Sequence, residues 1–318
     1  MNLIDRYIEY ITVVRHYSLR TKEIYSGVLQ GFARACDART DSELLASLDR
    51  DILRGYMVRL TEEGAKTSTV DLHLSVLSGF CRFLTREGEL KVNPVKTVKR
   101  PEGEKRAPVF YRSDEIAAYF KETEQDASAG TVSLIAGNDK VSLELWTRRR
   151  DRLVISILYN TGLRRSELIG LDIGSVDFAR GNIRVTGKGG KMREIPLVNA
   201  LSEEISLYLH STAKILGGER PADSPLLVTE KGGRLYPMAV ERIVRRRLAG
   251  AGISARKFPH ALRHTLATEL LGDGADINSI KELLGHSSLA ATQVYTHTSV
   301  EKLKQSYSSA HPRAKRGG

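Results

Sequence analysis

Residues 260–298 read HALRHTLATELLGDGADINSIKELLGHSSLAATQVYTHT, and this stretch decides how the whole chain is interpreted. Its apolar residues recur at helical spacing, and glycine and serine interrupt them. The same run carries His260, Arg263, His286 and Tyr295. Imidazoles, a guanidinium and a phenol are an odd set for a structural segment, but they suit chemistry on a phosphodiester. The rest of the chain must supply whatever else such chemistry needs.

The chain of 318 residues has a formal net charge of +11, with 41% hydrophobic and 27% charged residues. This composition is typical of an ordinary globular protein with room for two domains, and it excludes a disordered chain. A basic balance attracts polyanions, so nucleic acid or an anionic membrane is the expected partner, with nucleic acid favoured. No apolar run approaches the roughly 20 residues that cross a bilayer.

The two cysteines, Cys36 and Cys81, fall in helical apolar patterns and are expected to be buried free thiols. Two cysteines are not a disulfide framework. The N-terminus carries Asp5 and Glu9 in an amphipathic run, which does not resemble a signal peptide. We therefore expect a cytoplasmic protein without membrane contacts.

The first 90 residues predict a compact bundle of four helices. Apolar stripes at helical spacing cover residues 2–15, residues 49–63 and two stretches that open near Ser18 and Ser68. From 91 to 108, prolines alternate with lysines and arginines, which predicts an interdomain linker. Whether this linker lies along a phosphate backbone or is a solvated tether stays open.

Residues 109–310 predict a second, mostly helical domain with one small antiparallel sheet. Helices are expected at 114–120, 150–160, 199–213 and 237–250, and short strands at 176–178, 183–186, 192–197 and 226–228. Residues 121–147 carry mixed signals. The basic tail at 311–318 is expected to be disordered. The fold class predicted for the chain is mainly α with a small antiparallel β-sheet.

The motif TGLRRSEL at 161–168 places Arg164 and Arg165 at the start of a helix. Cations there oppose the helix dipole, and such a broken local rule marks a candidate functional site. Glu167 lies on the same face as Arg164 and can fix a guanidinium or an imidazole by hydrogen bonding. Taken alone, the motif fits an exposed Arg–Glu pair equally well.

Lys188 lies at the tip of a predicted hairpin in VTGKGGKMREIPL, residues 185–197. The glycines allow a turn that approaches a ligand closely. A phosphate-binding P-loop is excluded, since Gly189 rather than serine or threonine follows the lysine, and a strand rather than a helix comes next. A lone hairpin lysine is usually solvated, so this motif matters only beside the others.

His260, Arg263 and His264 fall at i, i+3 and i+4, on one face of a helix. The two histidines have the spacing of a zinc-protease pair, but the glutamate base is missing and a guanidinium stands between them. A metal site is therefore rejected. His264 is interpreted as a support of the fold.

His286 and Tyr295 are nine residues apart, which would place them on opposite faces of one straight helix. Gly285 ends the preceding helix, however, and Ser287 or Ser288 can cap a new one. This break lets both side chains turn toward one site. Either residue alone could instead be a satisfied polar group of the core.

Together these residues supply what phosphoryl transfer without a metal requires. Two arginines can bind the non-bridging oxygens and offset the charge of a pentacoordinate phosphorane. A tyrosine can form a covalent phosphoester, a lysine can protonate the departing alkoxide, and histidines can take or hold the phenolic proton. No cofactor is expected, neither metal nor ATP, because the bond energy is kept in the phosphotyrosine.

The ordered motifs TGLRRSEL, GKGGKMREIPL, HALRH, LLGH and VYTH resemble the signatures of tyrosine recombinases, the phage integrase and Xer group. Five motifs in the right order are specific, although each alone is not. The N-terminal helices and Asn93–Val95 also resemble the family, as its core-binding, SAM-like domain. Residues 121–147 look longer than the matching piece of compact members.

The resemblance implies a fold with a helical core-binding domain and an α+β catalytic domain. It implies a metal-independent recombinase that exchanges strands of double-stranded DNA through a 3′-phosphotyrosyl intermediate and a Holliday junction. The expected assembly is a homotetramer on two DNA sites, with a last helix near 300–309 docked on a neighbour. The implied catalytic shell consists of Arg164, Lys188, His260, Arg263 and His286. Glu167 is the implied supporting acid, and Tyr295 is the implied nucleophile.

Two other functions compete with this hypothesis. A type IB topoisomerase resembles the same catalytic set, whereas a non-catalytic DNA-binding regulator could be built on the cations of residues 240–248. The sequence does not separate phosphate contacts from base contacts, and a run of cations equally fits a solvated helix face. The expected additional DNA contacts are Arg165, Lys191, Arg242, Arg245 and Arg246.

Overall fold

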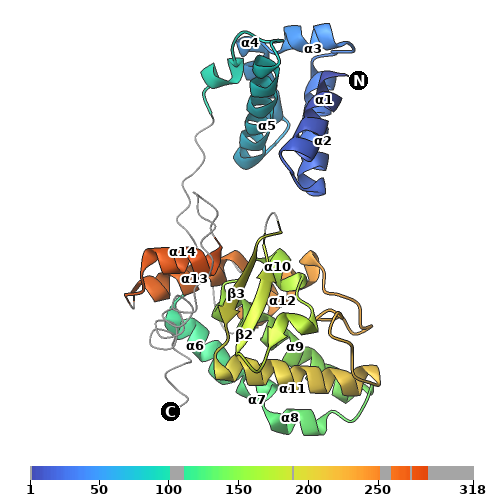
Figure 1. Ribbon diagram of the computed structural model, residues 1–318, viewed down its shortest axis with the longest axis vertical. Helices are drawn as coiled ribbons and strands as arrows, with labels where there is room; N and C mark the ends of the chain where they lie inside the picture. Colours follow the sequence, from blue (N-terminus) through green and yellow to red (C-terminus); the bar gives the residue numbers. More distant parts are fainter. Residues whose placement is uncertain (1, 101–110, 188–189, 251–258, 273, 286–318) are drawn as a thin grey trace. The chain divides into compact units, whose positions relative to one another are not determined.

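The computed structural model of the chain describes residues 2–100, 111–187, 190–250, 259–272 and 274–285 (Figure 1). By its internal contacts the chain divides into two compact units, Met1–Arg106 and Ala107–Gly318. Each unit contains its own cluster of buried apolar side chains. Each can therefore stabilise its fold through its own core.

The N-terminal unit is a helical bundle (Figure 1). Phe32, Leu53, Leu77 and Phe80 are fully buried between its helices, as the apolar stripes predict. The four predicted helices are all present among the described residues, and the structure adds a short fifth one, α3. The helices are α1 (Leu3–Glu9, continued by a π-helical turn at Tyr10–Val14), α2 (Leu19–Ala35), α3 (Asp41–Ser47), α4 (Arg50–Glu62) and α5 (Thr67–Arg86).

Helix α3 begins at a capping box that the apolar pattern does not reveal. The Glu43 N–H donates to Thr40 Oγ1 at 3.2 Å, and the Thr40 N–H donates to Glu43 Oε2 at 2.9 Å. These reciprocal bonds satisfy backbone donors that have no partner inside the helix. Leu44 is buried and holds this short helix on the core.

The start of the expected linker folds onto the N-terminal unit, although most of its side chains are exposed. A 3₁₀ helix spans Pro94–Thr97, with Asn93 as its cap. The Asn93 side chain donates to the Ser78 carbonyl of α5 at 3.0 Å, and Val95 is buried in the core of the N-terminal unit. Proline suits the first position of a helix because its missing N–H would be unpaired there anyway. Of the expected linker, residues 101–108 lie outside the described residues.

The second unit is built around α9 (Lys140–Thr161), which packs against α11, α12 and α13. Leu153, Val154, Ile157 and Leu158 of α9 are fully buried. The helix is longer than the predicted 150–160 because it continues N-terminally through the buried Trp146. The other α-helices are α6 (Ser113–Glu122), α7 (Glu124–Ala127), α8 (Ala129–Leu134), α10 (Arg165–Ile169), α11 (Asn199–Leu216), α12 (Pro237–Gly250), α13 (Pro259–Gly272) and α14 (Ile277–Leu284).

Three antiparallel strands form the small sheet, in the order β1 (Val176–Asp177), β2 (Asn182–Thr186) and β3 (Met192–Pro196). Figure 1 labels β2 and β3, and Arg193 of β3 donates to Glu167 of α10. The short strand expected at 226–228 does not form. Pro225, directly before that segment, and Val228 make single bridges to Asp172 and Arg234, so no partner runs alongside long enough for a ladder.

Residues 121–147 fold as the end of α6, the short helices α7 and α8, and the first turns of α9. Arg149 is buried in α9 and donates to the carbonyls of Ala127, the last residue of α7, and Ser128, the residue before α8. Asp139 caps α9 by accepting from the backbone of Val141 and Ser142, each at 3.0 Å. Polar bonds to α9 thus accompany the buried Val132 and Ile135, and this combination accounts for the mixed sequence pattern of the segment.

Candidate active site

Two glycines with left-handed backbones shape the site. Gly162 ends α9 with φ 62°, and Gly285 follows α14 with φ 64°. A Cβ on Gly162 would lie 2.6 Å from Cδ2 of Leu284, so the end of α9 is in close contact with the end of α14. Only glycine adopts this backbone conformation without steric cost and leaves room for that contact.

Arg263 of α13 joins these two helix ends. Its Nη1 donates to the Gly162 carbonyl at 2.6 Å and its Nη2 to the Leu284 carbonyl at 2.5 Å. The side chain is buried. Burial and the nearby positive charge of Arg164 lower the pKa of Arg263 to about 10, so it remains a cation at neutral pH.

Arg164, the residue before α10, approaches the same helix end from another side. Its Nη2 donates to the Gly285 carbonyl at 2.9 Å, and its Nη1 donates to Glu167 Oε1 at 2.9 Å. Its backbone N–H also donates to Glu167 Oε2 at 2.9 Å. The side chain stays 34% exposed, so its guanidinium is fixed yet still reachable from solvent.

Glu167 is a buried carboxylate held in its ionised form. Burial acts to raise its pKa, but hydrogen bonds and charge from Arg193 and Arg164 outweigh burial and lower the pKa below the ordinary value. The exposed Arg–Glu pair that the sequence left open is therefore not what forms. Instead the acid bridges two guanidiniums in a site of low exposure.

Arg193 of β3 is the second guanidinium on Glu167, and the sequence prediction missed it. Its Nη1 and Nη2 donate to the two carboxylate oxygens at 3.1 and 2.9 Å, and its Nε donates to the Leu283 carbonyl at 3.1 Å. One signal could have revealed it. Arg193 and Ile195 alternate onto the same buried face of the predicted strand, and a cation placed there needs a buried partner.

The last two carbonyls of α14 and the carbonyl of Gly285 thus each accept from an arginine. Arg193 donates to Leu283, Arg263 to Leu284 and Arg164 to Gly285. These carbonyls have no intrahelical donor, and they form the negative end of the helix dipole. The arginines therefore satisfy the helix end, and the helix end offsets part of the repulsion among them.

His260 lies on α13 next to this cluster, with an exposed ring. Its centroid is 6.4 Å from that of His264, which is also exposed. Partial desolvation and the positive charges of Arg263, His264 and Arg164 lower the pKa of His260. The ring is thus biased toward the neutral form, which can accept a proton.

Lys188, His286 and Tyr295 lie outside the described residues. Gly187, directly before Lys188, and Gly285, directly before His286, are described. A Cβ on Gly187 would lie 3.5 Å from Nη1 of Arg193 and 3.6 Å from Oε1 of Glu167. A Cβ on Gly285 would lie 3.1 Å from the same Nη1. The chain therefore reaches this cluster immediately before Lys188 and immediately before His286.

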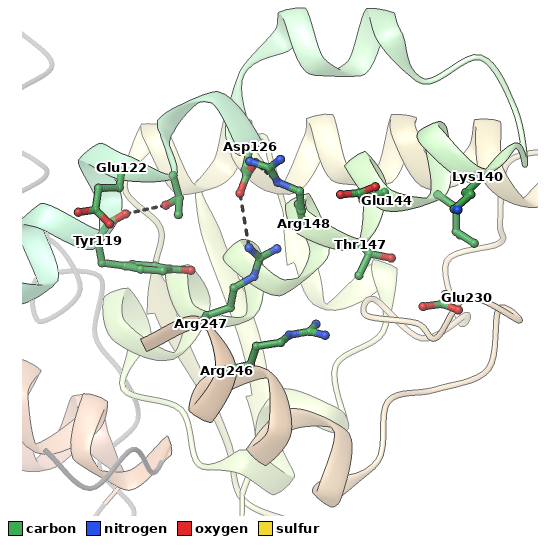
Figure 2. Close-up of a pocket in the computed structure, with 12 residues that line it drawn as sticks. Tyr119, Glu122, Asp126, Lys140, Glu144, Thr147, Arg148, Glu230, Arg246 and Arg247 are labelled. Carbon is green, nitrogen blue, oxygen red and sulfur yellow. Dashed lines mark hydrogen bonds and ion pairs between the residues drawn. The ribbon is translucent and has the colours of Figure 1, made fainter. Parts of the chain in front are cut away.

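The expected DNA contacts lie on α10, on α12 and directly before β3. Arg165 and Arg245 both pair with Glu241, at 3.2 and 3.3 Å, and Arg246 pairs with the buried Asp151. Figure 2 shows Arg246 at a cavity of about 620 Å³ that Asp126 also lines. Lys191 and Arg242 are exposed. The ion pairs of Arg165, Arg245 and Arg246 compete with any phosphate contact.

Within the described ranges, no helix is both long and apolar enough to span a membrane. In the same ranges, no group of three histidine, cysteine or acidic side chains is arranged to hold a metal ion.

Comparison with known families is consistent with this geometry. The phage integrase family matches residues 141–302, and the phage integrase N-terminal SAM-like domain matches residues 4–88. Tyrosine recombinase XerC of Chlorobaculum tepidum is 32% identical, with 98% of this chain and 94% of the relative covered. Tyrosine recombinase XerC of Azotobacter vinelandii is 34% identical, with 98% and 97% covered.

Solved structures share the fold at lower identity. The Tn1549 transposon integrase in complex with transposon right end DNA has a TM-score of 0.67 and 18% identity, over 96% of this chain and 99% of that one. The XerH site-specific recombinase bound to palindromic difH substrate has a TM-score of 0.65 and 21% identity, over 96% and 83%. The resemblance predicted from five ordered motifs is confirmed, and the chain belongs to the phage integrase family of tyrosine recombinases.

Proposed function

We propose that the protein is a site-specific DNA recombinase that breaks and rejoins strands through a 3′-phosphotyrosyl intermediate and a Holliday junction. The observation that carries the proposal is the convergence of Arg164, Arg193 and Arg263 on the end of α14, directly before His286. Such a concentration of fixed cations suits a phosphodiester whose negative charge increases in the transition state. No step in the scheme uses a metal ion or ATP.

In this proposal Arg164 and Arg263 bind the non-bridging oxygens of the scissile phosphate. Backbone carbonyls already orient both guanidiniums, so little reorganisation is needed when DNA binds. A guanidinium carries five N–H donors, and these contacts use only some of them. Glu167 supports the arrangement by holding Arg164, while His260 and His286 complete the shell around the phosphate.

The reaction proceeds in two balanced steps. The Tyr295 oxygen attacks phosphorus, the bond from phosphorus to the 5′-oxygen breaks, and a 3′-phosphotyrosine forms. Lys188 protonates the departing 5′-oxygen, and a histidine, with His260 biased toward its neutral form, takes the phenolic proton. A 5′-hydroxyl of the partner strand then attacks the phosphotyrosine by the reverse route and restores the phenol.

The proposed partners are double-stranded DNA and three further copies of the chain. Support for a tetramer comes from a solved relative in fold, a lambda integrase tetramer bound to a Holliday junction. Residues 1–90 would act as the core-binding domain, 91–108 as the linker and 109–310 as the catalytic domain of a cytoplasmic enzyme. Further backbone contacts are assigned to Arg165, Lys191, Arg242, Arg245 and Arg246, of which Arg165, Arg245 and Arg246 would exchange a carboxylate for a phosphate.

The test uses a duplex selected for binding from a random-sequence library and then nicked beside each phosphate in turn. Nicking lets the short cleaved strand diffuse away, so that the covalent complex accumulates. We expect a denaturation-resistant adduct with wild-type protein and none with Tyr295→Phe. An adduct that persists in Tyr295→Phe would refute the assigned nucleophile, and relaxation of plasmids lacking the selected site would favour a topoisomerase.

A further inference from the structure

Arg193 occupies a position that costs free energy unless it is paired. It lies on the buried face of β3, opposite Val185 of β2, with 9% of its side chain exposed. A cation in that place is stabilised only by close and complete partners. Its bidentate contact with Glu167 and its bond to the Leu283 carbonyl use nitrogen atoms on every arm of the guanidinium.

These partners come from segments that are distant in sequence. Glu167 lies on α10, Leu283 lies in the last turn of α14, and Arg193 lies on β3, the second strand of the hairpin that carries Lys188. Arg193 is also the nearest side chain to a Cβ built on Gly187 or on Gly285. The residues directly before Lys188 and directly before His286 therefore both lie beside one guanidinium, close enough that a side chain at either position would meet it.

We infer that Arg193 is a positioning residue for strand cleavage. It holds the Lys188 hairpin, the Glu167 carboxylate and the end of α14 in one fixed arrangement and does not itself contact the phosphate. The inference rests on the proposed function, because it names what orients the proposed catalytic groups. Its buried guanidinium distinguishes it from Arg164, which is one-third exposed and available to DNA.

The charge on Glu167 predicts a pH dependence of cleavage in an Arg193 variant that loss of packing alone would not produce. The charged groups that face this carboxylate among the described residues are Arg164 beside α10, Arg193 on β3 and Arg263 on α13. Without Arg193, the effect of burial on Glu167 is opposed mainly by Arg164, and its pKa rises. Protonation then removes an acceptor from Arg164, so cleavage by an Arg193 variant should weaken as the pH falls.

The experiment measures single-turnover cleavage of the selected nicked duplex from acidic to neutral pH, with DNA affinity measured in parallel. We expect Arg193→Met to cleave about 100-fold more slowly at neutral pH, as a misplacement of roughly 1 Å can do. Its activity should also decline at a higher pH than that of the wild type, with DNA affinity nearly unchanged. Arg193→Lys keeps a cation near Glu167, and it should recover part of the rate and the wild-type pH profile.

Two further variants separate positioning from folding. The double variant Arg193→Met, Glu167→Gln leaves no unpaired buried charge, so it should fold. It should cleave slowly, and its cleavage rate should no longer decline as the pH falls, because the titrating carboxylate is absent. Arg180→Met makes the same substitution at an exposed arginine before β2, remote from the hairpin tip, and should cleave like the wild type.

The inference is overturned if Arg193→Met keeps the wild-type rate and profile, or if its lost rate only follows its lost folded fraction. The proposed function is judged by a different outcome, namely wild-type protein that forms no adduct with any nicked duplex.

Discussion

Replacing Gly162 by alanine tests the contact between the ends of α9 and α14. Its φ of 62° lies in the left-handed region, where a side chain costs about 1–2 kcal/mol. The new Cβ would also lie 2.6 Å from Cδ2 of Leu284 and 3.1 Å from Cδ2 of Leu266. Overpacking of that kind costs about 1–3 kcal/mol more. We expect Gly162→Ala to lower the free energy of unfolding by about 2–5 kcal/mol.

Gly181 provides a matched control. Its φ is also 62°, but a Cβ there would meet no atom within 4 Å. Gly181→Ala therefore carries only the conformational cost, about 1–2 kcal/mol. The difference between the two variants isolates the packing of Leu284 and Leu266 against Gly162, because the same backbone strain is present in both.

The assay is thermal unfolding followed by tryptophan fluorescence. Trp146, the only tryptophan in the chain, is fully buried in α9, so the signal reports on the second unit alone. A unit of this size loses about 2–4 °C in Tm per kcal/mol, which predicts a loss of about 4–20 °C for Gly162→Ala and about 2–8 °C for Gly181→Ala. Equal losses in the two variants would refute the packing argument. Gly162→Ala should also slow cleavage, because a displaced Leu284 carbonyl no longer holds Arg263.

Two further outcomes are expected. The folded-state pKa of Glu167 lies below its ordinary value of 4.5, so the stability from its ionised form is complete above about pH 4.5 and is lost as the pH falls through the lower folded value. The stability difference between wild type and Glu167→Gln in urea unfolding, followed by Trp146 fluorescence, should therefore shrink from about pH 6 to pH 3, and a constant difference would contradict the assignment. Adduct formation should proceed at the same rate, within about twofold, in EDTA and in Mg²⁺, because arginines rather than a metal offset the charge. A rate that requires Mg²⁺ would contradict the scheme.

Local signals carried most of the fold prediction. Helix α5 has a stripe that includes Leu74, Leu77, Phe80 and Leu84, all buried, and such a stripe is visible in sequence. The missed α3 had a signal of another kind, the Thr40–Glu43 capping box, which an apolar count does not register. The expected strand at 226–228 was wrong because a strand requires a partner, and partners are not local information.

The same limit applied to the site. Arg164, Arg263 and Glu167 were found because reactive side chains in ordered motifs stand out in sequence, and the structure brings these three together. Arg193 was missed because its role consists of contacts with α10 and α14, which are far from it along the chain. The sequence showed which side chains can take part in phosphoryl transfer, whereas the packing showed that Arg193 contacts the elements that carry them.

The charge balance of the cluster follows from these contacts and bears on its chemistry. Three guanidiniums and one carboxylate leave two net positive charges beside the end of α14. The carbonyls of that helix end stabilise the three guanidiniums in the DNA-free protein, so these guanidiniums do not need further carboxylates as partners. A phosphodiester brings one negative charge and a pentacoordinate phosphorane brings two. In the proposed reaction the cluster therefore matches the transition state better than the bound substrate, which is the difference that accelerates a chemical step.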